Sequence, residues 1–78
     1  MPTVALEGQF RFVVNPRESS FEPPHVHVWV GGGDVCRIEF NGTTYMDELP
    51  PGHWRDILEA YRRHAVAIRA TWDQIHGR

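Results

Sequence analysis

The sequence predicts an α+β fold, an antiparallel sheet of three to five strands covered on one face by a long C-terminal helix. Two patterns carry this prediction. Before residue 47, short stretches alternate apolar and polar side chains with a period of two, as half-buried strands do. After residue 50, apolar residues recur at spacings of three and four, as on one face of a helix. We therefore expect one domain over residues 1–78, with the sheet in 1–46 and the helix in 50–76.

The strands are expected in the first 46 residues. TVAL at 3–6 and QFRFVVN at 9–15 pair across a turn near Glu7-Gly8, and a loop of prolines and polar residues follows. HVHVWV at 25–30 alternates most regularly, and the glycine turn GGGD leads into VCRIEF at 35–40. Asn41-Gly42 favours a type I′ hairpin turn before the short strand TTYM at 43–46.

One long helix is expected at the C-terminal end. Its apolar stripe consists of Trp54, Ile57, Leu58, Tyr61, Ala65, Ile68, Trp72 and Ile75. Pro51 suits the start, because its missing N–H would be unpaired there in any case, and Gly77 is placed to end the helix. The stripe drifts little, which favours a single helix from 51 to 76; a break near His64 is the alternative.

The two faces of HVHVWV differ in chemistry. Val26, Val28 and Val30 share one face, which we expect to pack against the helix stripe together with Ile38 and Phe40. Two histidines and a tryptophan share the other face. Antiparallel sheets tolerate one face without a helix, so we expect this second face to be open unless a partner covers it.

Composition limits the classes of function. With 41% hydrophobic and 23% charged residues, the chain is that of a soluble globular protein. No apolar run is long enough to span a bilayer and no signal peptide is recognised, so we expect a cytoplasmic protein with no membrane partner. The single cysteine, Cys36, excludes an internal disulfide and a multi-thiolate zinc site, and is expected in the core.

Charge argues against a long groove for nucleic acid, because the net charge is −2 and such grooves require a basic surplus. The basic residues are nevertheless all arginine, and Arg62, Arg63 and Arg69 lie close together on the predicted helix. Arginine suits bidentate contact with phosphate or carboxylate. A local basic face is therefore compatible with the sequence.

Three interpretations of the face formed by His25, His27 and Trp29 stay open. The first is a metal site at His25 and His27, two imidazoles on one strand face. The chain offers no further ligands at a fixed spacing, so this is the weakest of the three. We expect no cofactor.

The second interpretation is acid–base chemistry. Metal-independent RNA cleavage needs a base for the 2′-hydroxyl, an acid for the leaving oxygen and a cation for the phosphorane. Imidazole titrates near neutral pH, so His25 and His27 suit the first two roles. Arg17 or Arg37 would supply the cation, with Arg11 as a further candidate, and the neighbouring tryptophan would stack a base. If the chain is an enzyme, we expect a metal-independent ribonuclease.

The third interpretation involves no chemistry. The two histidines would form a structural polar pair, or the face would dock a protein or nucleic acid with Trp29 as its anchor. Glu22, directly before the strand, is expected to assist binding. His64 is a further candidate for binding; it flanks the helix stripe, where a hydrogen-bonded core histidine is favoured over a catalytic one. Whether the chain is an enzyme stays open, as does a homo-oligomer.

Several short motifs occur together in one family. They are MPT, FRF, EPPHVHV, the glycine turn, the Leu-Pro start of the helix, and the helix residues Tyr61, His64, Trp72 and Asp73. The chain resembles the small bacterial proteins of the domain of unknown function 4160 family over essentially its whole length. PPHVHV, at Pro23–Val28, is the most specific motif. One departure is Ala67-Ile68, where the family often carries Glu-Leu.

The resemblance implies a partner. Members of the family typically lie beside a gene for a domain of unknown function 2442 protein, an arrangement that resembles a toxin–antitoxin operon. The chain is then expected to be the toxin-like component, with the antitoxin-like protein of the neighbouring gene as its partner. Joined to the residue chemistry, this favours action on RNA through the histidine face. The alternative is a non-enzymatic regulatory or binding module.

Overall fold

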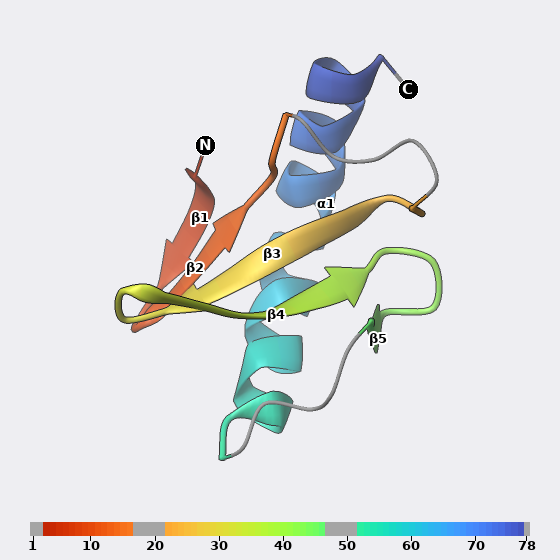
Figure 1. Ribbon diagram of the computed structural model, residues 1–78. Helices are drawn as coiled ribbons and strands as arrows, with labels where there is room; N and C mark the ends of the chain where they lie inside the picture. The colour runs from red at the N-terminus through yellow and green to blue at the C-terminus, as the bar shows by residue number, and fades with distance from the viewer. Residues whose placement is uncertain (1–2, 17–21, 47–51, 78) are drawn as a thin grey trace.

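The computed structural model describes residues 3–16, 22–46 and 52–77. Within these ranges the chain forms one sheet and one helix (Figure 1). The elements are β1 (Thr3–Glu7), β2 (Phe10–Val13), β3 (His25–Val30), β4 (Gly33–Glu39), β5 (Thr44–Tyr45) and α1 (Trp54–His76). The strands pair in chain order, and each neighbouring pair is antiparallel. The predicted α+β fold is confirmed.

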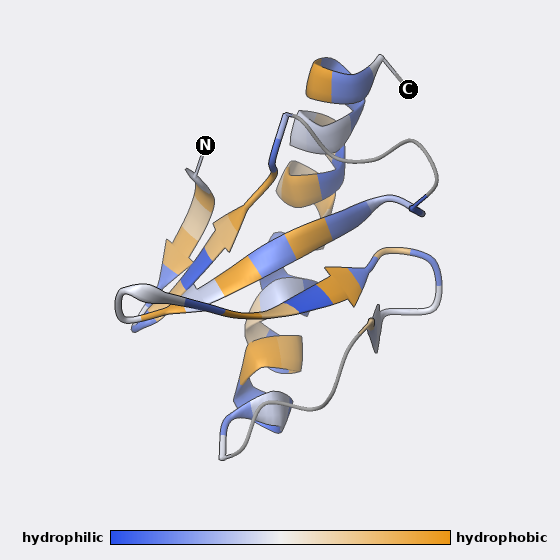
Figure 2. Ribbon diagram, viewed as in Figure 1, coloured by the Kyte–Doolittle hydropathy of each residue, from blue (hydrophilic) through white to orange (hydrophobic). Residues whose placement is uncertain are grey.

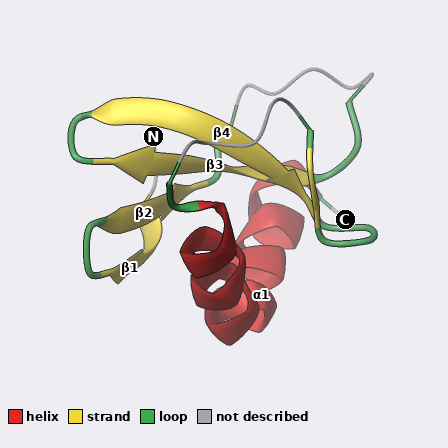
Figure 3. Ribbon diagram, turned by 90° about the horizontal axis from the view of Figure 1, so that it is seen from below, coloured by secondary structure: helices red, strands yellow, loops and turns green. Residues whose placement is uncertain are grey.

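The helix packs on one face of the sheet, and Figure 3 shows the strands forming a layer above it. The core between the two layers consists of Phe10, Phe12, Val14, Val26, Val28, Cys36, Ile38, Ile57, Ala60, Tyr61, Ile68 and Trp72. Polar and apolar residues alternate along β3 (Figure 2). The expected valine face is confirmed for Val26 and Val28, which have no exposed surface, while Val30 at the strand end is half-buried.

The helix α1 runs without interruption through His64, so the alternative of a broken helix is wrong. It ends where predicted. Gly77 adopts a left-handed conformation with φ of 72°, and its N–H donates to the carbonyl of Asp73. Glycine adopts this conformation without the steric cost that a Cβ would add. The helix begins later than the predicted start near residue 51, because Gly52 has φ of 82° and His53 is the N-cap residue, so the first helical residue is Trp54; Pro51 itself lies outside the described residues. No helix in the described part of the chain is long and apolar enough to cross a membrane.

Two local expectations are wrong. A type I′ turn requires positive φ at both Asn41 and Gly42. Only Gly42 has it, with φ of 91°, and the N–H of Thr43 bonds to the carbonyl of Phe40, which is the pattern of a type II turn. Trp54 was expected in the core but is 37% exposed. Trp54 is the first residue of α1, and the guanidinium of Arg55 lies over its ring, 4.9 Å from the centroid.

Candidate functional site on the open sheet face

The sheet face opposite the helix carries a histidine–aspartate pair. His27 lies within β3, and its Nδ1 donates a hydrogen bond to Oδ2 of Asp34 over 3.1 Å. Because a carboxylate only accepts, Nδ1 holds the proton and the neutral ring carries its lone pair on Nε2. The His27 side chain is 17% exposed. The hydrogen bond therefore holds one imidazole of the open face in a defined orientation.

A β-bulge brings the aspartate to this face. The strands β3 and β4 pair in one register up to Val28 and Cys36, and the register shifts before the pair of Trp29 and Asp34. Val35 is the extra residue. In an unbroken register Asp34 would point toward the helix, because side chains alternate between the two faces. The bulge re-aims its carboxylate toward the histidine and leaves Val35 43% exposed.

The guanidinium of Arg37 belongs to the residue that pairs with His27 on the neighbouring strand, β4. Its Nη1 donates to Oε2 of Glu22 over 2.6 Å. Hydrogen bonding from Arg37 lowers the pKa of Glu22 below its ordinary value of 4.5, against the opposing effect of burial. The charge of the two nearby imidazoles lowers this pKa further. Glu22 is therefore a carboxylate at neutral pH, within electrostatic reach of His27.

The second histidine of the motif is not on the surface. His25 has no exposed area, its Nδ1 donates to the carbonyl of Pro23 over 2.8 Å, and its ring centroid lies 5.6 Å from that of Trp72. The expectation that His25 belongs to the open face is therefore wrong. β2 ends at Val13, opposite His27. His25 lies past that end, where Trp72 of the helix packs against it.

The structure places two more of the predicted residues beside the pair. Arg11 of β2 is opposite Trp29 of β3, and Asp34 flanks the same tryptophan on the other side. Arg11 is exposed and Trp29 is half-buried. The indole Nε1 is buried and hydrogen-bonds to no residue in the described ranges. Only part of the indole is therefore available to a ligand.

Two predicted residues do not join this site. His64 lies on α1, and its Nε2 donates to Oε1 of Glu7 over 2.9 Å. Arg63 also pairs with Glu7 and lowers the pKa of that carboxyl. This cluster ties the helix to the edge strand β1. The expected hydrogen bond of His64 is present, but its side chain is 31% exposed and does not belong to the core. Arg17 lies outside the described residues.

Metal binding gains no support from the geometry. Within residues 3–16, 22–46 and 52–77, no three side chains of histidine, cysteine, aspartate or glutamate are grouped to hold an ion. The rings of His25 and His27 lie 5.2 Å apart, and each already uses Nδ1 for a hydrogen bond. A metal site at these two histidines would therefore lack supporting ligands.

Sequence reasoning missed Asp34. The stretch GGGD was interpreted as a turn alone, because no helix N-terminus follows it. A usable signal was present, since a tight glycine hairpin between two strands brings its flanking residues close together. The bulge that decides which face Asp34 takes had no sequence signal, because Val35 suits a regular strand as well.

Comparison with known proteins identifies a family. Residues 9–73 match the family described as Domain of unknown function (DUF4160). The matched region includes the whole open-face site, from Arg11 to Arg37. A search of curated proteins and a search of solved structures each gave no match. Because the match spans most of its length, the chain belongs to the domain of unknown function 4160 family.

Proposed function

We propose that this protein is the toxin-like component of a bacterial two-gene module and that it cleaves single-stranded RNA without a metal ion. One observation carries the proposed chemistry. The imidazole of His27 is oriented by Asp34 on the open face, directly opposite the guanidinium of Arg37. The toxin-like role and the antitoxin-like partner rest on the family resemblance.

Cleavage at this face would be a transphosphorylation. The carboxylate of Glu22 removes the proton of the 2′-hydroxyl, and the 2′-oxygen attacks phosphorus. The bond between phosphorus and the 5′-oxygen breaks, and Nε2–H of protonated His27 donates its proton to that oxygen. The products are a 2′,3′-cyclic phosphate and a 5′-hydroxyl. Overall, Glu22 gains a proton and His27 loses one, so solvent resets both groups.

The remaining residues would support this step. Arg37, whose Nη1 donates to Glu22, would place a guanidinium beside the negative charge that develops on the phosphorane. Asp34 would hold the His27 ring in one orientation by accepting a hydrogen bond from Nδ1, the nitrogen that does not face the substrate. Trp29 and Arg11 lie next along the same face and would contact a neighbouring base and phosphate.

The direct test is incubation of the full chain with an end-labelled single-stranded RNA, in the presence of EDTA. We expect fragments that end in a 2′,3′-cyclic phosphate, identified by mass spectrometry. The same sequence made of DNA should stay intact, because it lacks the 2′-hydroxyl. RNA that survives a large molar excess of folded protein would refute the proposed reaction.

Matched variants assign the roles. His27→Ala and Glu22→Gln should each lower the cleavage rate about 100-fold or more, the usual contribution of a general acid or base. His53→Ala is the control, because this histidine packs edge-on against Phe10, 6.0 Å between ring centroids, away from the site. His27→Ala should also relieve growth arrest when the protein is expressed alone in bacteria. Retained toxicity in His27→Ala would contradict the assigned role.

A second candidate function is a non-enzymatic module that docks protein or nucleic acid on this same face. The observation in its favour is that the charged groups are already paired within the protein, His27 with Asp34 and Arg37 with Glu22. Such pairs make a stable polar surface. Binding of RNA with no cleavage, and with equal affinity for the DNA of the same sequence, would favour this candidate.

A further inference from the structure

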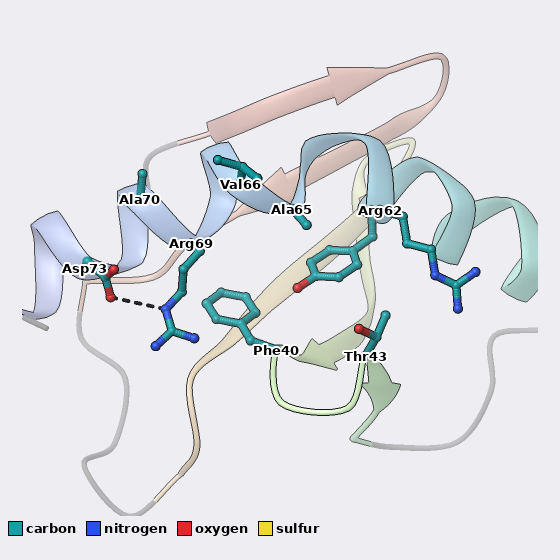
Figure 4. A pocket seen from close by; sticks show the side chains of 9 residues that line it. Phe40, Thr43, Arg62, Ala65, Val66, Arg69, Ala70 and Asp73 are labelled. Carbon is teal, nitrogen blue, oxygen red and sulfur yellow. Dashed lines mark hydrogen bonds and ion pairs between the residues drawn. The ribbon is translucent and has the colours of Figure 1, made fainter.

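A groove runs between α1 and the turn that joins β4 to β5, on the helix side of the sheet. Its volume is about 540 Å³. Figure 4 shows Phe40 and Thr43 facing the helix across this groove, with Arg62 and Asp73 at its two ends. None of these residues belongs to the site on the open sheet face, so the groove is a separate surface.

The wall of the groove is apolar. Ala65, Val66 and Ala70 line it from the helix, and Phe40 lines it from the sheet. Val66 is 86% exposed, the largest exposed fraction among the large hydrophobic residues that the structure describes. Solvent-facing apolar side chains around a hollow are typical of an interaction surface.

The charged residues of the groove are mainly positive. Arg62 and Arg69 both line it, against the single carboxylate of Asp73. Arg69 is held in place, because its guanidinium lies 5.7 Å from the centre of the Phe40 ring and its Nε donates to Asp73 over 3.3 Å. No carboxylate in the described part of the chain forms an ion pair with Arg62.

From this combination we infer that the groove binds an acidic amphipathic helix of a partner protein. The lining residues from Arg62 to Asp73 span about 16 Å along α1, at 1.5 Å per residue. Three turns of a partner helix match that length and place apolar side chains at i, i+3 or i+4, and i+7 against the apolar wall. Its carboxylates would pair with the two arginines. The inference does not depend on the proposed RNA chemistry.

Charge argues against two other occupants. The groove carries two arginines and one carboxylate, so two copies that meet through this surface bring together two patches of net positive charge, which opposes their association. A nucleic acid strand requires several cations along its phosphates. Two arginines, one of them already paired with Asp73, beside an apolar wall do not provide that array.

The test is a display selection with random peptides of about 16 residues, long enough for four helical turns. Peptides are selected on the full chain and depleted on the double variant Arg62→Glu/Arg69→Glu. We expect the enriched sequences to be acidic and to carry apolar residues at helical spacing. No enrichment over the depletion step overturns the inference, and so does enrichment without an acidic bias.

The selected peptide then locates the site. Arg62→Glu and Arg69→Glu should each weaken its binding at least about tenfold in fluorescence anisotropy, since each removes a charge-assisted hydrogen bond and adds repulsion. Val66→Asp, at a highly exposed position, should do the same and keep the helical circular dichroism of the parent. Arg55→Glu is the control, because this arginine packs over Trp54 outside the groove.

Three results would reassign the groove. Equal binding by Arg55→Glu and Arg69→Glu would remove the peptide from it. Self-association of the protein that Val66→Asp abolishes would make a second copy the occupant. Competition by a short RNA that shifts the amide resonances of the groove residues would make it a nucleic-acid surface. If the groove binds a protein helix, RNA cleavage should be unchanged in Val66→Asp, which separates this surface from the proposed active face.

Discussion

Replacing the two motif histidines by alanine should have opposite consequences for folding and function. His25 is fully buried, contacts the ring of Trp72 and donates to the carbonyl of Pro23. Truncation leaves a cavity and a carbonyl without its donor, which together cost about 2–4 kcal/mol. His27 is partly exposed and loses one hydrogen bond near the surface, which costs less than about 1 kcal/mol.

Urea titration monitored by tryptophan fluorescence measures both values. A domain of this size is stable by roughly 4–12 kcal/mol, so His25→Ala should unfold at a much lower urea concentration with the same slope. Its melting temperature should fall by roughly 10–30 °C, against a few degrees for His27→Ala. Equal stabilities of the two variants would refute the assignment of His25 to the core. If His25→Ala is the less stable variant, as expected, then its loss of toxicity in a growth assay reports unfolding and not the loss of a catalytic group.

Three further outcomes follow from the geometry. Gly77→Ala should lower stability by about 1 kcal/mol in thermal melts, because alanine resists the left-handed conformation that ends α1. Glu7 and Glu22 have lowered folded pKa values, so their contribution is complete above 4.5 and is lost as pH falls through those lower values. The double variant Glu7→Gln/Glu22→Gln should accordingly show a flatter stability profile below pH 4.5 in acid titrations. Deleting Val35 should remove the bulge and leave Asp34 directly before Cys36, so alternation keeps the aspartate on the open face; long-range ¹H–¹⁵N spectra should still show the Nδ1–H preference of His27, and loss of that preference would contradict Val35 as the extra residue.

Strand positions and their main faces could be predicted because they depend on local pattern. Alternation in HVHVWV and VCRIEF placed Val28 and Cys36 in the core, and their burial confirms both. The end of α1 was predictable for the same reason, since Gly77 follows the last residue of the stripe. These features require only the period of two or of 3.6 and one turn residue.

The burial of His25 could not be predicted from local pattern. Alternation gives it the same face as His27, and the strand alone offers no reason to separate them. The separation depends on where β2 ends and on where Trp72, far along the chain, meets the sheet. Likewise the bulge at Val35 depends on how the hairpin closes. Both are long-range packing outcomes, and together they decide the composition of the candidate site.

The paired charges of the open face determine how a phosphate would be recognised there. Arg37 forms an ion pair with Glu22, and the carboxylate of Asp34 accepts a hydrogen bond from His27. The chain as a whole carries a net charge of −2. A polyanion in its ground state therefore gains little attraction from this surface, and weak binding is expected. A phosphorane concentrates more negative charge on the oxygens that face Arg37, so the guanidinium contributes most at that point. We therefore expect rapid release of RNA from the open face, whereas the groove on α1 is a separate surface for which we propose a protein partner.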